Sequence, residues 1–170
     1  FNVENHFIYT RLIDGKYINY EQVIPVSNNK TLLVNRLELL QAVRRVAIVS
    51  DPLIHQVILR LRPELIELYV STSEFGEARE EVAATFSESE LDIAYNAQYL
   101  IDILTHMEAN EIQFKLAMPT TAGLVLPVEN AINEDFLGLI MPILIEDEAT
   151  LSYKILLGLK TNNGMAEGGQ

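Results

Sequence analysis

The chain of 170 residues contains no cysteine. This absence excludes disulfides, thiolate zinc sites and cysteine nucleophiles together, and it fits a reducing cytosol. Long hydrophobic runs are also missing, because the longest apolar stretch, residues 136–145, is only about ten residues long. A helix that crosses a bilayer needs roughly 18–20 apolar residues. The sequence therefore predicts no membrane-spanning helix.

The sequence signatures of common enzymes are missing as well. There is no Gly-x-Gly-x-x-Gly or Walker-type phosphate loop and no Gly-x-Ser-x-Gly elbow. The three histidines, His6, His55 and His106, are not spaced as metal ligands. Acidic groups at residues 80–81 and 146–148 have the oxygen ligands that hard cations prefer, but such groups are typical of a solvated surface. We expect no cofactor, no metal site and no catalytic residue.

Positive charge is scarce overall but unevenly distributed. The chain has 24 acidic and 12 basic residues and a net charge of −12 at pH 7, which argues against a generic nucleic-acid binder. Residues 71–92 contain seven acids against one base, whereas residues 33–50 contain three arginines against Glu38 alone. This distribution is consistent with one acidic face and another that is mildly basic.

The first part of the chain is predicted to be extended. Residues 1–12 are typical of a strand pair with a turn near residues 4–5, and an extended stretch is expected at residues 17–25. The first residues do not form a signal peptide. Because the chain starts at phenylalanine rather than methionine, we expect it to be a fragment of a longer protein.

The order strand–helix–strand–strand–strand occurs twice along the rest of the chain. Asn35 and Asn96 are predicted helix N-caps, each following a short strand. The helices are expected to end near Ser50 and Asn110, and three strands follow each of them, at 55–62, 64–71, 78–86, 112–118, 123–128 and 136–145. This pattern predicts an α+β fold in which two helices pack on one face of a continuous antiparallel sheet.

Three pairs of residues in the predicted elements each allow a structural and a functional interpretation. Arg44 and Arg45 lie on the polar arc of the first helix, where they either meet phosphates or form a solvated face. Tyr95 and Tyr99 line either the core or a pocket, and the periodicity of the elements in which they lie favours the core for both. The pair formed by Met141 and Pro142 interrupts an apolar strand, either as a bulge that ends the sheet or as an edge that docks an extended peptide.

Five blocks of sequence resemble the third domain of the bacterial DNA polymerase III beta subunits, the sliding clamps. They are residues 11–25 (RLIDGKYINYEQVIP), 37–50 (LELLQAVRRVAIVS), 76–81 (GEAREE), 91–104 (LDIAYNAQYLIDIL) and 140–143 (IMPI). The resemblance covers about residues 7–145 in family order. It implies that residues 1–12 end the preceding, middle domain, that residues 13–145 form the C-terminal clamp domain, and that residues 146–170 extend beyond the family.

The resemblance also implies a function for the intact protein, that of a non-enzymatic processivity factor. Two subunits, each of three such domains, would join head to tail in a homodimeric ring that encircles double-stranded DNA without sequence preference. Helices would line the hole, where contacts to phosphate are weak and salt-sensitive. Arg44 and Arg45 are the predicted DNA-facing residues. The implied location is the bacterial cytoplasm, in association with the nucleoid and not with a membrane.

Family members carry a pocket in this domain that receives short peptides from the DNA polymerase III catalytic subunit, the clamp loader and repair proteins. Matched block by block, the pocket is expected to be apolar, with an amide and a phenol that orient the peptide. Its predicted lining residues are Ile18, Gln22, Val23, Ile54, Asn96, Tyr99, Leu139, Ile140, Met141 and Pro142.

Residues 146–170 have a composition typical of a disordered segment, with an apolar stretch at 151–159. Because they follow the predicted pocket directly, they are either a solvated extension or a cover that competes with partners. Two other interpretations of the whole chain also remain. One is an unrelated α+β domain that binds a small ligand or catalyses a reaction, and the other is a diverged clamp homologue that no longer closes a ring.

Overall fold

The computed structural model describes residues 2–3, 6–7, 9–11, 14–15, 19–129 and 136–145. Its helices are α1 (Arg36–Val46) and α2 (Ala97–His106), with short 3-10 helices η1 (Tyr20–Gln22) and η2 (Ala47–Val49). Its strands are β1 (Asn2–Val3), β2 (His6–Phe7), β3 (Lys30–Asn35), β4 (Gln56–Leu61), β5 (Leu65–Thr72), β6 (Gly76–Phe86), β7 (Leu91–Asn96), β8 (Glu111–Leu116), β9 (Gly123–Pro127) and β10 (Gly138–Ile140). The strand–helix–strand–strand–strand order occurs twice, as predicted.

Eight of these strands form one antiparallel sheet in the order β10-β9-β8-β3-β6-β5-β4-β7. Strand β6 joins the two halves, because its last residues pair with β3 and the rest of it pairs with β5. The two outermost strands of this sheet also come together. The backbone N–H of Ile143, three residues after β10, donates to the carbonyl of Ala94 in β7 at 2.8 Å.

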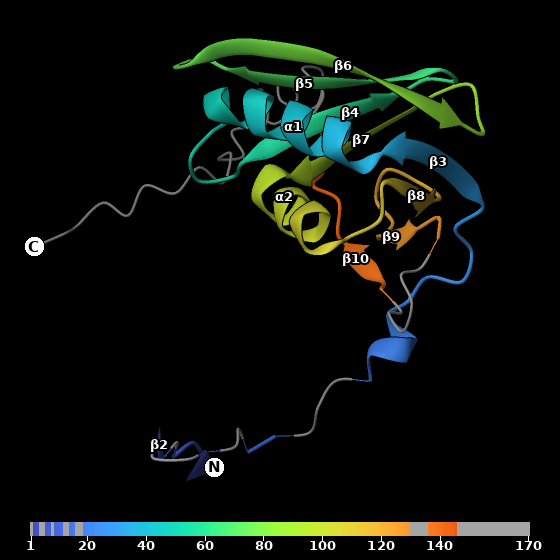
Figure 1. Ribbon diagram of the computed structural model, residues 1–170. Helices are drawn as coiled ribbons and strands as arrows, with labels where there is room; N and C mark the ends of the chain where they lie inside the picture. Colours follow the sequence, from blue (N-terminus) through green and yellow to red (C-terminus); the bar gives the residue numbers. More distant parts are fainter. Residues whose placement is uncertain are drawn as a thin grey trace, which may run out of the picture.

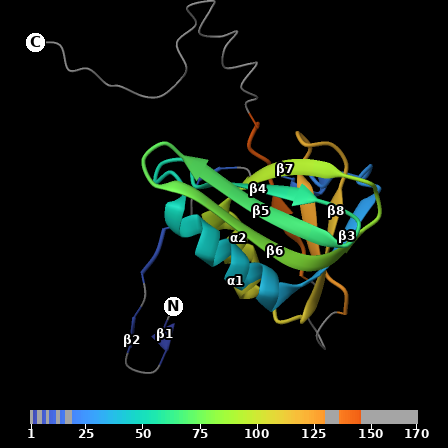
Figure 2. The same cartoon turned by 90° about the horizontal axis from the view of Figure 1, so that it is seen from above.

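Both helices lie side by side on one face of the curved sheet (Figures 1 and 2). Each helix begins at its predicted cap: the Asn35 side chain accepts from the N–H groups of Leu37 and Glu38, and the Asn96 side chain accepts from those of Gln98 and Tyr99. Arg36 holds the far end of α2, because its guanidinium donates to the carbonyls of Leu104 and Ala109. The predicted α+β arrangement is confirmed.

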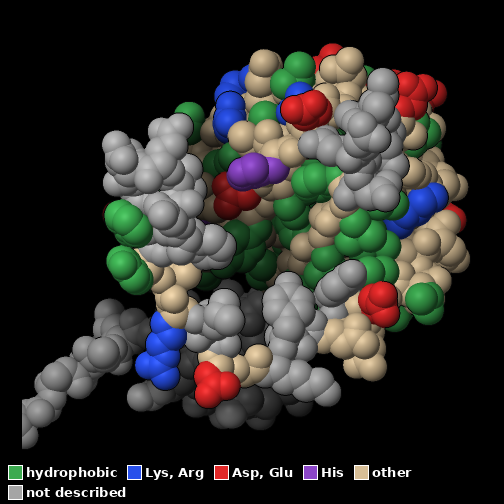
Figure 3. Space-filling view, turned by 60° about the horizontal axis from the view of Figure 1, so that its bottom comes forward, with side chains coloured by type: hydrophobic (Ala, Val, Ile, Leu, Met, Phe, Trp, Pro, Cys, Tyr) green, Lys and Arg blue, Asp and Glu red, His purple; other side chains and the backbone are tan. Residues whose placement is uncertain are grey.

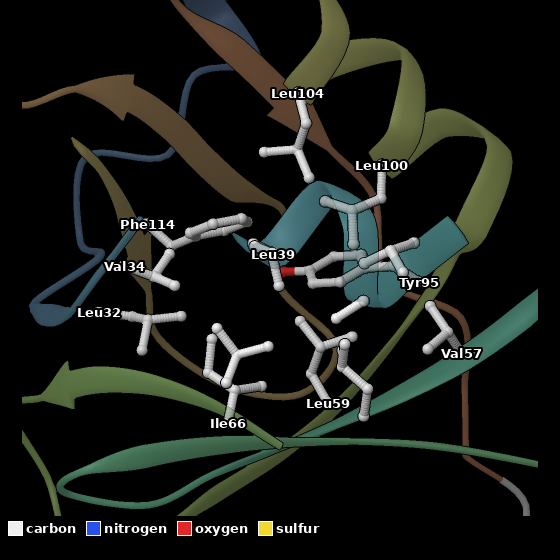
Figure 4. Packing of buried hydrophobic residues seen from close by; sticks show 14 of the residues in the cluster. Leu32, Val34, Leu39, Val57, Leu59, Ile66, Tyr95, Leu100, Leu104 and Phe114 are labelled. Carbon is white, nitrogen blue, oxygen red and sulfur yellow. The ribbon is translucent and has the colours of Figure 1, made fainter. Parts of the chain in front are cut away.

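The core lies between the helices and the sheet. Figure 4 shows Leu39 of α1 and Leu100 and Leu104 of α2 pointing toward side chains from β3, β4, β5, β7 and β8. Their burial follows from the apolar spacing of the helices, since residues three or four apart lie on one helical face. Tyr95 is fully buried in this cluster, as its position in the strand pattern predicted.

Two predicted elements were wrong in extent. Within the expected extended stretch at residues 17–25, the described part contains the 3-10 helix η1, where the Asn19 side chain accepts from the N–H of Glu21. The expected strand at 136–145 shortens to β10, which ends at Ile140. Pro142 has no N–H for a sheet ladder, so regular pairing stops beside it.

Near the start of the chain, β1 and β2 pair as predicted, with Val3 opposite His6. Residues 146–170, for which a disordered composition was noted, lie outside the described residues. Neither helix in the described part of the chain has the length and apolar character that a membrane crossing requires.

Candidate peptide-docking pocket

A pocket of about 580 Å³ lies between the first turns of α2 and the segment that follows β10. Its volume falls within the usual range for small-ligand and peptide-anchor sites. The residues that line it are Asn96, Tyr99, Asp102, Ile103, Leu139, Ile140, Met141, Pro142 and Ile143. Figure 3 shows the lower face of the molecule as drawn in Figure 1, where hydrophobic side chains gather around a hollow.

The helical wall of the pocket results from the spacing of α2. Asn96, Tyr99 and Ile103 lie three or four residues apart, so their side chains project from one face of the helix. Tyr99 is 63% exposed, although the helical period favoured the core for it. That preference was wrong: Leu100 and Leu104 occupy the buried arc, and Tyr99 lies beside it at the edge of the pocket.

The opposite wall is formed by the chain that leaves β10. Met141 is 62% exposed, whereas Ile140 beside it is buried. The bridge between Ile143 and Ala94 holds this wall against β7, the strand that leads into α2. The two walls are therefore fixed relative to each other by a backbone hydrogen bond, and the apolar groups between them are accessible.

Asn96 has two roles at the floor of this site. Its side-chain oxygen caps α2, and its Nδ2 donates to the carbonyl of Ile54 at 3.1 Å. The N–H of Ala97 also donates to the carbonyl of His55 at 2.7 Å. These bonds attach the loop before β4 to the start of α2, so the pocket rests on a rigid support.

The predicted lining residues separate into three groups. The structure brings Asn96, Tyr99 and residues 139–142 together around the pocket. Ile54 is joined to Asn96 by its carbonyl and lines a smaller neighbouring cavity of about 110 Å³. Gln22 and Val23 are exposed residues of η1 and the turn after it, and neither is among the lining residues; Ile18 lies outside the described residues.

Three lining residues were not predicted: Asp102, Ile103 and Ile143. The helical period carries a signal for Asp102 and Ile103, since they continue the face begun by Asn96 and Tyr99. Ile143 joins the site through its pairing with Ala94, a contact between segments far apart in sequence.

The predicted DNA-facing arginines lie on the exposed face of α1. Arg45 forms two hydrogen bonds with the Glu80 carboxylate, at 2.7 and 3.1 Å, and these bonds raise the pKa of Arg45 and lower that of Glu80. Arg44 instead donates to Thr105 of α2 at 3.4 Å, and it makes no ion pair within the described residues. Both guanidinium groups are charged, but in the described part of the chain only that of Arg45 is paired with a carboxylate, so the charge of Arg44 is the less compensated of the two.

The acidic side chains of the described residues are engaged in other contacts or stand apart from one another. The described residues contain no group of three or more His, Asp or Glu side chains that could hold a metal ion. Glu80 is engaged by Arg45, and Glu81 contacts Arg79. The largest concave feature described above is apolar, with an amide, a phenol and one carboxylate at its margin, which suits binding of an apolar peptide anchor.

The family model for the C-terminal domain of the DNA polymerase III beta subunit matches residues 21–144. The chain belongs to this family. The beta sliding clamp of Pseudomonas aeruginosa is 31% identical over 133 residues, which cover 78% of this chain and 35% of that protein. The beta sliding clamp of Caulobacter vibrioides is 34% identical over 121 residues, 71% of this chain and 32% of that protein.

Solved clamp structures agree with the sequence comparison. A DNA polymerase sliding clamp from Pseudomonas aeruginosa superposes with a TM-score of 0.75 at 29% identity, over 80% of this chain and 36% of that chain. A sliding clamp from Bartonella birtlesii, bound to griselimycin, gives a TM-score of 0.73 at 31% identity. The match covers 78% of this chain and 35% of that chain. The chain thus spans about a third of the length of these relatives. The predicted resemblance is confirmed, and the alternative of an unrelated α+β domain is not favoured.

Proposed function

We propose that this chain is the peptide-docking domain of a bacterial sliding clamp, a DNA polymerase processivity factor with no catalytic activity of its own. In this proposal residues 1–12 end the preceding domain, residues 13–145 form the docking domain and residues 146–170 extend it. The assembled protein works in the bacterial cytoplasm on nucleoid DNA. It docks the DNA polymerase III catalytic subunit, the clamp loader and other proteins that carry a clamp-binding motif.

The observation that carries the proposal is the exposed apolar pocket between α2 and the chain after β10. Met141 and Tyr99 are large side chains of this pocket that remain more than half exposed. Burial of such groups by a hydrophobic anchor is favourable by about 25 cal/mol per Å² of apolar surface. The phenol of Tyr99 adds a polar group that can orient a peptide backbone, and the amide of Asn96 holds the start of α2 in place beneath it.

Family membership supports the second part of the proposal, a ring that contacts DNA. The subunits of a ring meet head to tail, and a homodimer closes when the rotation permits. We propose that α1 faces the DNA and that Arg44 supplies the stronger phosphate contact. Arg45 contributes less, because its charge is largely compensated by Glu80. Such contacts are individually weak, and their loss is expected to reduce the salt dependence of DNA association.

A peptide titration tests the docking function. A fluorescent peptide that carries the clamp-binding motif of a bacterial replicative polymerase is added to the full chain, and its anisotropy is measured. Replacing Met141 and Tyr99 together by alanine should weaken binding at least tenfold, because buried anchors commonly contribute more than 1 kcal/mol each.

The matched control is Met118→Ala, since Met118 is also 62% exposed but does not line the pocket. This variant should bind the peptide as the unmodified chain does. Griselimycin, which is bound in the Bartonella birtlesii clamp, serves as a second probe and should displace the peptide. Equal binding by the Met141/Tyr99 double variant and the Met118 control would overturn the proposed site.

A further inference from the structure

The pocket lies close to the point where the described chain stops. Ile143 lines it, and Ile145 is the last described residue. The family model matches up to residue 144, so residues 146–170 lie beyond the matched domain. Within them, residues 151–159 (LSYKILLGL) form an apolar stretch that is flanked by the polar sequences EDEAT and KTNNG. An exposed apolar pocket and an apolar segment are thus neighbours in the same chain.

We propose that residues 151–159 dock in this pocket in cis and compete with partner peptides. The inference rests on the proposed function, because it assigns a regulator to the same docking site. The occupant is a segment of the chain itself, and its effect is to raise the apparent dissociation constant of every external peptide that uses the pocket.

The covalent connection permits this contact. Five residues, 146–150, lie between Ile145 and Leu151. An extended chain spans at most 3.3–3.6 Å per residue, so the six steps from Ile145 to Leu151 reach about 20 Å. The pocket wall at 139–143 lies only a few residues before Ile145. A short connection of this kind gives an effective concentration on the order of 1 mM. Even a segment with an intrinsic dissociation constant of about 0.1 mM would then weaken external binding about tenfold.

The chemistry of the segment matches that of the pocket. Leu151, Ile155 and Leu159 recur every four residues, the spacing of an apolar helical stripe that fits a hydrophobic groove. Asp102 is the one charged residue among the residues that line the pocket. Lys154 is the one charged residue in the proposed occupant, residues 151–159, and the acids at 146–148 lie in the connection before it. Docking of the segment therefore brings an opposite charge to the side of the pocket that carries a carboxylate.

Substitutions in the full chain test the proposal without shortening it. The variant Ile155→Asp with Leu156→Asp places two charges in the apolar segment and should bind the fluorescent clamp-motif peptide about tenfold more tightly than the unmodified chain. The matched control, Met165→Asp with Ala166→Asp, adds the same charge outside the segment and should leave the affinity unchanged. Equal affinities for both variants would overturn the inference.

Two further measurements separate this inference from the proposed function. A synthetic peptide of residues 149–160 should displace the fluorescent peptide from the Ile155→Asp/Leu156→Asp variant, and Lys154→Asp in the full chain should also tighten external binding. If the fluorescent peptide binds all variants equally and residues 149–160 do not displace it, self-docking is wrong and the docking function stands. If no variant binds the fluorescent peptide, the docking function itself is wrong.

Discussion

A close approach between Gly123 of β9 and Tyr95 of β7 makes the core beneath the pocket sensitive to a single methyl group. A Cβ atom on residue 123 would lie 2.6 Å from the Tyr95 hydroxyl oxygen and 3.0 Å from a methyl carbon of Leu116. Carbon atoms in a packed core prefer separations of about 3.5–4.0 Å. Gly123→Ala must therefore displace its neighbours, and overpacking of this kind costs typically 1–3 kcal/mol.

The Tyr95 hydroxyl is the main obstacle, and it gains nothing from its position. It is buried and has no hydrogen-bond partner among the described residues, and its burial raises the pKa of the phenol well above its ordinary value. A buried hydroxyl without a partner carries a desolvation penalty of about 1–3 kcal/mol. We expect the free energy of unfolding of Tyr95→Phe to equal that of the unmodified chain or to exceed it by up to about 1 kcal/mol. Combined with Gly123→Ala, it should restore most of the lost stability.

These effects can be measured by urea unfolding, with circular dichroism as the signal. A change in stability shifts the urea concentration at the midpoint and leaves the dependence of the unfolding free energy on urea concentration unchanged. The double-mutant cycle should give a coupling of about 1–2 kcal/mol between positions 95 and 123. Gly138→Ala is the control, because its Cβ would meet Ile103 at 3.0 Å rather than Tyr95, and Tyr95→Phe should not rescue it. A Tyr95→Phe variant that loses more than about 1 kcal/mol, or that fails to rescue Gly123→Ala, would refute this reasoning.

Three further predictions concern the supports of the helices. Asn96→Ala removes both the cap of α2 and the bond to Ile54, so the midpoint of urea unfolding should fall by an amount equivalent to about 1–2 kcal/mol, and peptide affinity should fall with it. Arg36→Ala removes two charged hydrogen bonds to the end of α2 and should cost about 2–3 kcal/mol in the same assay, whereas Arg44→Ala should cost little. The hydrogen bonds that Arg45 donates to Glu80 lower the pKa of Glu80. The pair therefore stabilises the fold fully at pH values above the ordinary glutamate pKa. This stabilisation is lost as the pH falls through the lowered pKa of Glu80. The thermal midpoint of Glu80→Gln should thus be lower than that of the unmodified chain at pH 7, and the difference should disappear as the pH falls through the lowered pKa of Glu80.

Local rules were sufficient to predict most of the fold. Asn35 and Asn96 mark the helix starts because an asparagine side chain satisfies backbone donors of the first turn, an interaction within a few residues. The prediction that Arg44 and Arg45 lie on the polar arc of the first helix was correct, because exposure follows the helical period. Within the predicted site, residues 139–142 and Tyr99 were placed through the family resemblance rather than through periodicity.

The features that could not be predicted depend on contacts between distant segments. The pairing of Ile143 with Ala94 brings the two outermost strands together, and no local pattern signals it. The ion pair of Arg45 with Glu80 joins α1 to β6, residues that are 35 positions apart, and it leaves Arg44 as the arginine of this pair without a carboxylate partner among the described residues. His55 adopts a positive φ of 52° where its carbonyl accepts from the N–H of Ala97. Positive φ is uncommon in residues other than glycine, and although histidine is enriched among the exceptions, its presence alone does not predict this conformation.

The most direct test of the central claim is to map, on the full chain, the backbone amides that respond to a clamp-motif peptide by ¹⁵N NMR titration. Docking in the proposed pocket predicts the largest shift changes at residues 96–103 and 139–143, with small changes at Met118 and in the β5–β6 hairpin. Shift changes concentrated away from α2 and the chain after β10, with residues 139–143 unaffected, would contradict the assignment of this pocket as the docking site.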